Sequence, residues 1–120
     1  REMRAALDAE AGRAYIRVVT HLARSQFVSW MAAADLMVGN SSSGIVEAAS
    51  FGTPVLNIGV RQSGRERNAN VRDLAADPRA LEPALAEALA RGRFPVANIY
   101  GDGATSGRIA SLLDLLPLER

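Results

Sequence analysis

The most chemically informative stretch of this chain is a run of small and hydroxyl-bearing residues that ends in an acidic side chain. It reads Gly39-Asn40-Ser41-Ser42-Ser43-Gly44-Ile45-Val46-Glu47. A predicted buried strand precedes the turn and an apolar helical segment follows it, so unpaired backbone N–H groups lie beside the hydroxyls. Such a helix N-terminus attracts anions, which makes it a candidate phosphate site. We predict that Glu47 lies on the first turn of this helix, where its carboxylate can accept two hydrogen bonds from a vicinal diol such as a ribose.

The same residues also have a purely structural interpretation. Residues 41–43 would then form only a helix N-cap, and Glu47 would complement the positive end of the helix dipole. A second polar cluster favours binding instead. It follows the next predicted strand and reads Arg61-Gln62-Ser63-Gly64-Arg65-Glu66-Arg67-Asn68. Because loops after successive parallel strands emerge at one edge of the sheet, we expect the two clusters to share a crevice.

Hydrophobic periodicity predicts an α/β fold with a parallel sheet of about four strands. The predicted strands cover residues 16–19, 36–39, 54–58 and 70–74, and the predicted helices cover residues 1–11, 26–34, 43–51, 78–91 and 105–116. Ser25 is the expected N-cap of the second helix, and Gly52 is expected to end the central one. Asp77 followed by Pro78 is the expected start of the fourth helix. Apolar residues of the last helix, such as Ile109, are predicted to face the core.

Composition narrows the class of protein. The chain has 120 residues, a net charge of +1 and no cysteine, and all 14 basic residues are arginine. This length suits one domain, and the near-neutral charge gives no indication of a nucleic-acid surface. Without cysteine there is no disulfide framework and no thiolate metal site. The sequence contains no run long enough for a membrane span and no signal peptide, so we expect a cytoplasmic protein.

Four segments of the chain resemble a known enzyme family. They are Gly39–Glu47, Asn57-Ile58-Gly59, the Arg-Gln-x-Gly-Arg-Glu loop at 61–66 and Asn98-Ile99-Tyr100-Gly101-Asp102-Gly103. Together they resemble the UDP-N-acetylglucosamine 2-epimerases, most closely the hydrolysing branch that makes N-acetylmannosamine for sialic-acid-type sugars. The resemblance runs from about residue 15 to residue 113, and family members are considerably longer two-domain enzymes. It therefore implies that residues 1–120 are an N-terminally truncated, C-terminal UDP-binding domain. That domain would be a Rossmann-like parallel sheet flanked by helices, the C-terminal half of a GT-B-type architecture.

The resemblance also implies a set of nucleotide contacts. The backbone of Leu22 would meet the uracil edge, Ser41 and Ser42 the diphosphate, and Glu47 the ribose. Ser43 and Gly44 would complete the phosphate turn, and Arg61 would meet the phosphates. His21 and Phe27 are candidate walls for the base. For these last two the alternatives are a solvated loop histidine and an inward-facing core residue.

In the family that the chain resembles, catalysis proceeds by anti-elimination of UDP followed by hydration of the unsaturated sugar. The acid and base come mostly from the N-terminal domain, so we expect no catalytic residue in this chain and no activity from the chain alone. No cofactor and no metal are expected. The expected partners are a UDP-acetamido sugar, the missing N-terminal domain and further copies in a homo-oligomer. Two alternatives remain open at this point, a GT-B-type glycosyltransferase and a non-catalytic nucleotide-binding domain.

Overall fold

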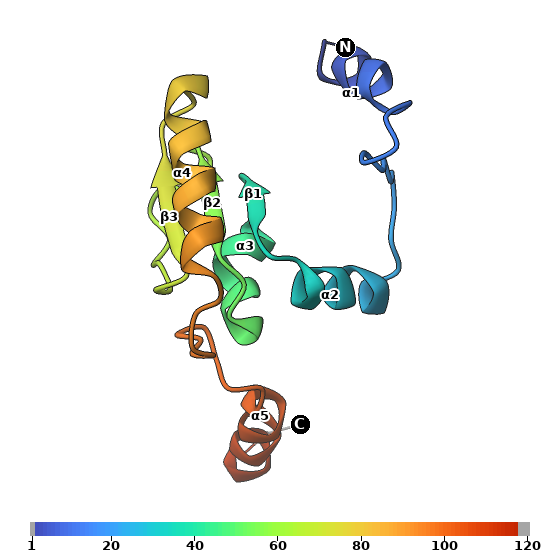
Figure 1. Ribbon diagram of the computed structural model, residues 1–120. Coiled ribbons are helices and arrows are strands. Elements are labelled where there is room, and N and C mark those ends of the chain that lie inside the picture. Colours follow the sequence, from blue (N-terminus) through green and yellow to red (C-terminus); the bar gives the residue numbers. More distant parts are fainter. Residues whose placement is uncertain (1, 118–120) are drawn as a thin grey trace.

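The computed structural model describes residues 2–117 and shows a small parallel sheet with helices around it (Figure 1). The elements in chain order are α1 (Glu2–Glu10), α2 (Arg24–Ala33), β1 (Met37–Gly39), α3 (Ser42–Val46), the 3-10 helix η1 (Ala48–Phe51), β2 (Val55–Ile58), β3 (Val71–Leu74), α4 (Pro78–Arg91) and α5 (Thr105–Leu115). The strands pair in the order β1-β2-β3, and both pairs are parallel. This confirms the predicted Rossmann-like α/β class, although the sheet has three strands within the described residues rather than the four predicted.

One face of the sheet carries the hydrophobic core. Met37, Val55 and Val71 are directly opposite one another across the three strands. Val55 clusters with Met31 of α2 and Ala48 of η1, and all three are almost fully buried. Partly buried apolar side chains surround this cluster: Phe27, Met37, Phe51 and Val71. The helices that connect to β1 and β2 therefore pack on the same side of the sheet.

Helix α4 covers the opposite face. Leu56 follows Val55 in β2, so its side chain points the other way, and it is 1% exposed. Ala84 of α4 is buried as well, whereas Val38, which shares the orientation of Leu56 on the neighbouring strand, is 46% exposed. Helix α4 thus shields β2 and β3 but leaves this side of β1 open.

The helix-end predictions met different outcomes. The Asp77 side chain accepts a hydrogen bond from the Arg79 N–H at 3.0 Å and Pro78 is the first helical residue, so the predicted start of α4 is confirmed. The prediction that Ser25 caps α2 is wrong. Helix α2 begins at Arg24, one residue before that serine, and the Gln26 side chain instead accepts a hydrogen bond from the Ala23 N–H at 3.4 Å. A side chain three residues inside the helix therefore replaces the expected serine cap.

The central helix is divided in two. Helix α3 ends at Val46, and four residues of 3-10 helix follow before Gly52 ends the segment at φ 64°. Glu47 lies at the junction as the C-cap of α3, where its N–H donates to Ser43 O at 2.9 Å. The prediction that Glu47 lies on the first turn is therefore wrong. Tighter i→i+3 bonds, such as Ser50 N–H to Glu47 O at 3.0 Å, replace the regular helical ladder beyond this point.

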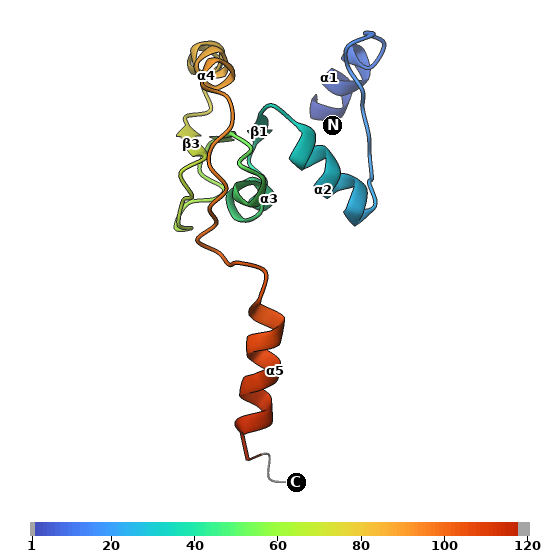
Figure 2. The same ribbon diagram turned by 60° about the horizontal axis from the view of Figure 1, so that its bottom comes forward.

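Both ends of the chain differ from the sequence prediction. Residues 16–19 are extended but form no strand, and Val18 and Val19 are 41% and 50% exposed. A strand requires a neighbour for its backbone N–H and C=O groups, and this segment connects α1 to α2 away from the sheet in both views (Figures 1 and 2). Helix α5 projects from the rest of the chain, and Ile109, which we expected in the core, is 52% exposed (Figure 2). The radius of gyration is accordingly 18.1 Å, against about 14 Å for a compact domain of this length.

Candidate functional site

The turn between β1 and α3 presents hydroxyls at the carboxyl edge of the sheet. Ser41 is the N-cap of α3, and its Oγ accepts a hydrogen bond from the Ser43 N–H at 3.3 Å. Ser41 and Ser42 are exposed, whereas Gly44 is buried. A Cβ atom added to Gly44 would lie 3.0 Å from Val55 Cγ1 of β2. The glycine therefore lets the start of α3 approach the sheet while the two serines remain open to solvent.

The loop after β2 lies against this turn. The Gln62 amide donates to Asn40 O at 2.8 Å, and Gln62 is 5% exposed. The Arg61 guanidinium donates to Asn40 O and Asn40 Oδ1, both at 3.4 Å, and the arginine is exposed. The two polar clusters therefore share one edge of the sheet, as the parallel topology predicts. The geometry leaves a cation beside the serine turn.

Arg67 holds the rest of that loop in place. Its Nε donates to both carboxylate oxygens of Asp73 in β3, at 3.2 and 3.0 Å, and its Nη2 donates to Gln62 O at 3.0 Å. The Arg67 guanidinium, followed by the Asn57 amide, hydrogen-bonds this carboxylate and holds the pKa of Asp73 below its usual value. Arg67 therefore ties the loop to β3 through Asp73. Arg61 instead points toward Asn40 in the turn between β1 and α3.

Two asparagines join the end of α3 to the C-terminal segment. Asn68 is 3% exposed, and its Nδ2 donates to Ile45 O and to Asn98 Oδ1, both at 3.2 Å. Its Oδ1 accepts from the Ile99 N–H at 2.8 Å, and Asn98 Nδ2 donates to Val46 O at 2.8 Å. The segments 39–47, 61–68 and 98–103 therefore converge on one short helix. Both asparagines lie within the motif segments, but the sequence pattern predicts no role for either of them.

Glu47 borders a hollow at the end of α3. Its side chain is 27% exposed and forms an ion pair with Arg24, the first residue of α2. Both residues line a hollow of about 340 Å³ together with Tyr100 and Gly101, and the Tyr100 hydroxyl donates to Glu66 O at 2.9 Å. The carboxylate is thus presented to a space large enough for a sugar, within a wall made from several distant segments.

Two of the residues predicted at the base line a second hollow. Leu22 and Phe27 line a separate hollow of about 270 Å³ beside Trp30 and Met37, and this hollow does not include Glu47. Phe27 also packs against the hydrophobic core, in line with its structural alternative, and His21 is exposed. The structure therefore places the serine turn, Arg61 and Glu47 around α3. The contacts of His21 and Phe27 with the base stay predictions.

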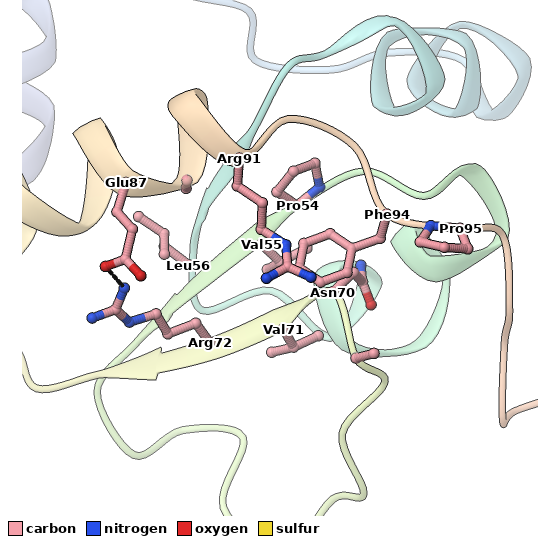
Figure 3. Close-up of a pocket in the computed structure, with 12 residues that line it drawn as sticks. Pro54, Val55, Leu56, Asn70, Val71, Arg72, Glu87, Arg91, Phe94 and Pro95 are labelled. Carbon is pink, nitrogen blue, oxygen red and sulfur yellow. Dashed lines mark hydrogen bonds and ion pairs between the residues drawn. The ribbon is translucent and has the colours of Figure 1, made fainter.

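A hollow larger than the one beside Glu47 lies away from this site. It has a volume of about 420 Å³ and lies between α4 and strands β2 and β3 (Figure 3). The Arg91 guanidinium lies over the Phe94 ring at 4.1 Å, and Asn70 is 4% exposed with its Nδ2 donating to Thr53 O at 2.7 Å. None of the predicted nucleotide contacts lines it. Chemistry rather than volume therefore identifies the candidate site.

Fold and site together define a Rossmann-like α/β domain with a polar site at the carboxyl ends of β1 and β2. The profile of the family described as UDP-N-acetylglucosamine 2-epimerase matches residues 1–114. The chain therefore belongs to the UDP-N-acetylglucosamine 2-epimerase family, which confirms the resemblance inferred from the motifs. Over residues 2–117, no helix has the length and apolar character that crossing a bilayer requires. The same part of the chain contains no group of three or more His, Asp or Glu side chains arranged to hold a metal ion.

Individual relatives support this placement. The chain is 47% identical over 104 residues to the UDP-N,N'-diacetylbacillosamine 2-epimerase (hydrolyzing) of Legionella pneumophila, a match that covers 87% of this chain and 28% of that protein. It is 46% identical over 57 residues to the GDP/UDP-N,N'-diacetylbacillosamine 2-epimerase (hydrolyzing) of Campylobacter jejuni, covering 48% and 15% respectively. It is 33% identical over 72 residues to the UDP-N-acetylglucosamine 2-epimerase of Neisseria meningitidis, covering 60% and 19%. The chain thus spans well under half the length of the relatives that it matches.

Proposed function

We propose that this chain is the UDP-binding part of a hydrolysing UDP-sugar 2-epimerase with a two-domain, GT-B-type architecture. The observation that carries the proposal is the convergence of three motif segments on α3, through Gln62 to Asn40 and through Asn68 to Ile45 and Asn98. These segments are far apart in the sequence, yet they lie together around α3. A ligand that contacts all three segments requires this arrangement. Membership of the epimerase family supplies the class of ligand.

In this proposal, different polar groups contact different parts of the nucleotide. Ser41, Ser42 and the backbone at the start of α3 bind the diphosphate, and Arg61 beside them meets its negative charge. Glu47 accepts hydrogen bonds from the ribose diol in the hollow beyond the end of the helix. Departure of UDP builds charge on the leaving phosphate, so the arginine and the backbone N–H groups stabilise the transition state for elimination.

The acid and base lie outside this chain in the proposed enzyme. Glu47 is the carboxylate that lines the hollow beside α3, and we assign it to ribose binding rather than to proton transfer. The chain alone is therefore expected to release no UDP from a UDP-sugar. The complete protein would add a preceding domain that closes over the sugar, and it would assemble as a homo-oligomer.

Two sugars are candidate substrates. The family description names UDP-N-acetylglucosamine, whereas the Legionella relative is named for UDP-N,N'-diacetylbacillosamine. The two sugars share the UDP group and the 2-acetamido group, and they differ at C4 and C6. The nucleotide contacts proposed here serve both, so the choice between them rests with the part of the enzyme that holds the sugar ring.

The test is to incubate the full-length protein with each UDP-sugar in deuterated water and to follow products by NMR. Elimination removes the C2 proton and hydration returns one from solvent, so the released 2-epimeric sugar should carry deuterium at C2. Transfer of the sugar to an acceptor without exchange at C2 would assign the protein to the glycosyltransferases instead. UDP binding without turnover of either sugar would favour a non-catalytic domain and contradict the proposal.

A further inference from the structure

The ion pair between Arg24 and Glu47 is unusual in its placement. Arg24 is the first residue of α2, and Glu47 is the C-cap of α3. The positive end of a helix dipole disfavours a cation, and the negative end disfavours a carboxylate. Arg24 therefore carries the charge that its own helix end disfavours. Glu47 is also the N-cap of η1, where a carboxylate is favoured, but its side chain accepts no capping hydrogen bond there. The charged partner of each side chain thus lies on a different helical segment.

The pair is also a weak source of tertiary stability. The Arg24 side chain is 68% exposed and that of Glu47 is 27% exposed. Exposed ion pairs typically contribute only about 0–1 kcal/mol, because water and salt screen the charges and two long side chains lose freedom. The pair therefore contributes little to holding α2 against α3.

The carboxylate faces the hollow of about 340 Å³. Arg24 Nη2 contacts Glu47 Oε2, and the carboxylate retains further lone pairs, including those of Oε1. Tyr100 and Gly101 also line the hollow, and Asn98 Nδ2 donates to the carbonyl of Val46, the residue before the glutamate. The backbone before Glu47 and the Oε2 atom of its side chain are thus both held by hydrogen bonds. This fixes the orientation of Oε1 and of the remaining lone pairs of the carboxylate.

We propose that Arg24 is a positioning residue that orients the Glu47 carboxylate for the vicinal diol of the nucleotide ribose. This inference rests on the proposed function, in which Glu47 is the ribose ligand. Arg24 holds one oxygen through its rigid guanidinium, which leaves the other oxygen and the remaining lone pairs for two hydroxyl groups. An oriented carboxylate loses less freedom when the diol binds, so Arg24 increases affinity for a ribose without touching it.

The experiment is calorimetric titration of the full-length protein with UDP and with 2'-deoxy-UDP, which lacks one of the two hydroxyls. Wild type should bind UDP about tenfold or more tightly than the deoxy nucleotide, as expected for loss of a hydrogen bond to a charged group. Arg24→Gln should reduce this preference about three- to tenfold by weakening UDP binding, with the deoxy nucleotide little affected. Arg24→Lys should keep more of the preference than Arg24→Gln does, because lysine retains the positive charge but lacks the planar guanidinium group. Arg79→Gln is the matched control, since that side chain is 91% exposed on α4 and is expected to change neither affinity.

The outcomes separate this inference from the proposed function. Unchanged preference in Glu47→Gln would remove Glu47 from the ribose site and overturn both. Loss of preference in Glu47→Gln with full preference in Arg24→Gln would overturn the role of Arg24 alone. Equal weakening of both nucleotides by Arg24→Gln would also overturn it, because a purely structural effect cannot distinguish the hydroxyl. The variant that combines Arg24→Gln with Glu47→Gln should show the same preference for UDP over 2'-deoxy-UDP as Glu47→Gln alone, since Arg24 acts only through the carboxylate. A further loss of preference in this double variant would contradict the inference.

Discussion

Replacing Gly52 with alanine should be among the most damaging small changes in this domain. Gly52 ends η1 with φ 64°, in the left-handed region that an alanine adopts at a penalty of about 1–2 kcal/mol. A Cβ atom at this position would lie 2.2 Å from the backbone oxygen of Phe94. Because that neighbour is backbone rather than a flexible side chain, the chain itself must move. The movement would break the hydrogen bond from the Phe94 N–H to Gly52 O, which is 2.9 Å long.

A second glycine provides the matched control. Gly64 also has a left-handed backbone, with φ 81°, but a Cβ atom there would meet nothing within 4 Å. Gly64→Ala should therefore lower the free energy of unfolding by the conformational penalty alone, about 1–2 kcal/mol. Gly52→Ala adds the lost hydrogen bond, about 0.5–1.5 kcal/mol, and the displacement of packed backbone, about 1–3 kcal/mol. The difference between the two variants should thus be about 1.5 kcal/mol or more.

Urea unfolding of the full-length protein measures the two free energies, and hydrogen exchange of the Phe94 amide reports the local effect. Exchange at that amide should accelerate in Gly52→Ala and remain unchanged in Gly64→Ala, because only the first variant breaks its hydrogen bond. If the two variants lose the same stability within about 0.5 kcal/mol, a typical limit for such comparisons, the steric argument is refuted. Slow exchange at Phe94 in Gly52→Ala would refute it independently.

Three further predictions concern charged side chains. Arg61→Ala should lower kcat/KM of the full-length enzyme, and a change of less than about threefold, or ~0.7 kcal/mol, would remove it from the phosphate site. Arg93 donates to Ala32 O at 2.5 Å, to Ala34 O at 3.0 Å and to Phe51 O at 3.0 Å, so it closes the ends of two helices. Arg93→Ala should lower the urea midpoint by an amount equivalent to about 2 kcal/mol, whereas Arg79→Ala should change it little. Because Arg67 lowers the pKa of Asp73, that carboxylate stabilises the fold above the unfolded pKa of about 4, and its contribution is lost as the pH falls through the lower folded pKa. The stability difference between wild type and Asp73→Asn should therefore shrink below about pH 4 in urea titrations, and a constant difference would contradict the assignment.

Much of the fold was predictable because its signals are local. Asp77 and Pro78 mark the start of α4 through interactions that span two residues, and the structure shows both in the expected roles. The strand at 55–58 lies in a largely apolar run, whereas the strand at 71–74, Val-Arg-Asp-Leu, is apolar only at its two ends. The parallel order of the strands predicts that the polar loops share an edge. Contacts within a few residues, or between neighbouring strands, are encoded in the pattern itself.

Two predictions failed because they depended on distant parts of the chain. The β-branched residues at 16–19 favour a strand, but a strand forms only where another strand meets it, and the described sheet places none beside this segment. The last helix has an apolar stripe, yet Ile109 and Leu112 are 52% and 62% exposed. Periodicity predicts which face is apolar, whereas burial requires a surface to pack against.

The sequence by itself determined the chemistry of the site: small residues and hydroxyls before α3, a glutamate after it and an arginine in the next loop. Only the tertiary structure decided how these groups face one another. It placed Glu47 at the end of α3 rather than on its first turn and paired it with Arg24, 23 residues earlier in the chain. It also joined Asn68 to Asn98 across 30 residues. Side-chain type is a local property, but the partner of a polar group depends on the packing of helices and loops that no local pattern encodes.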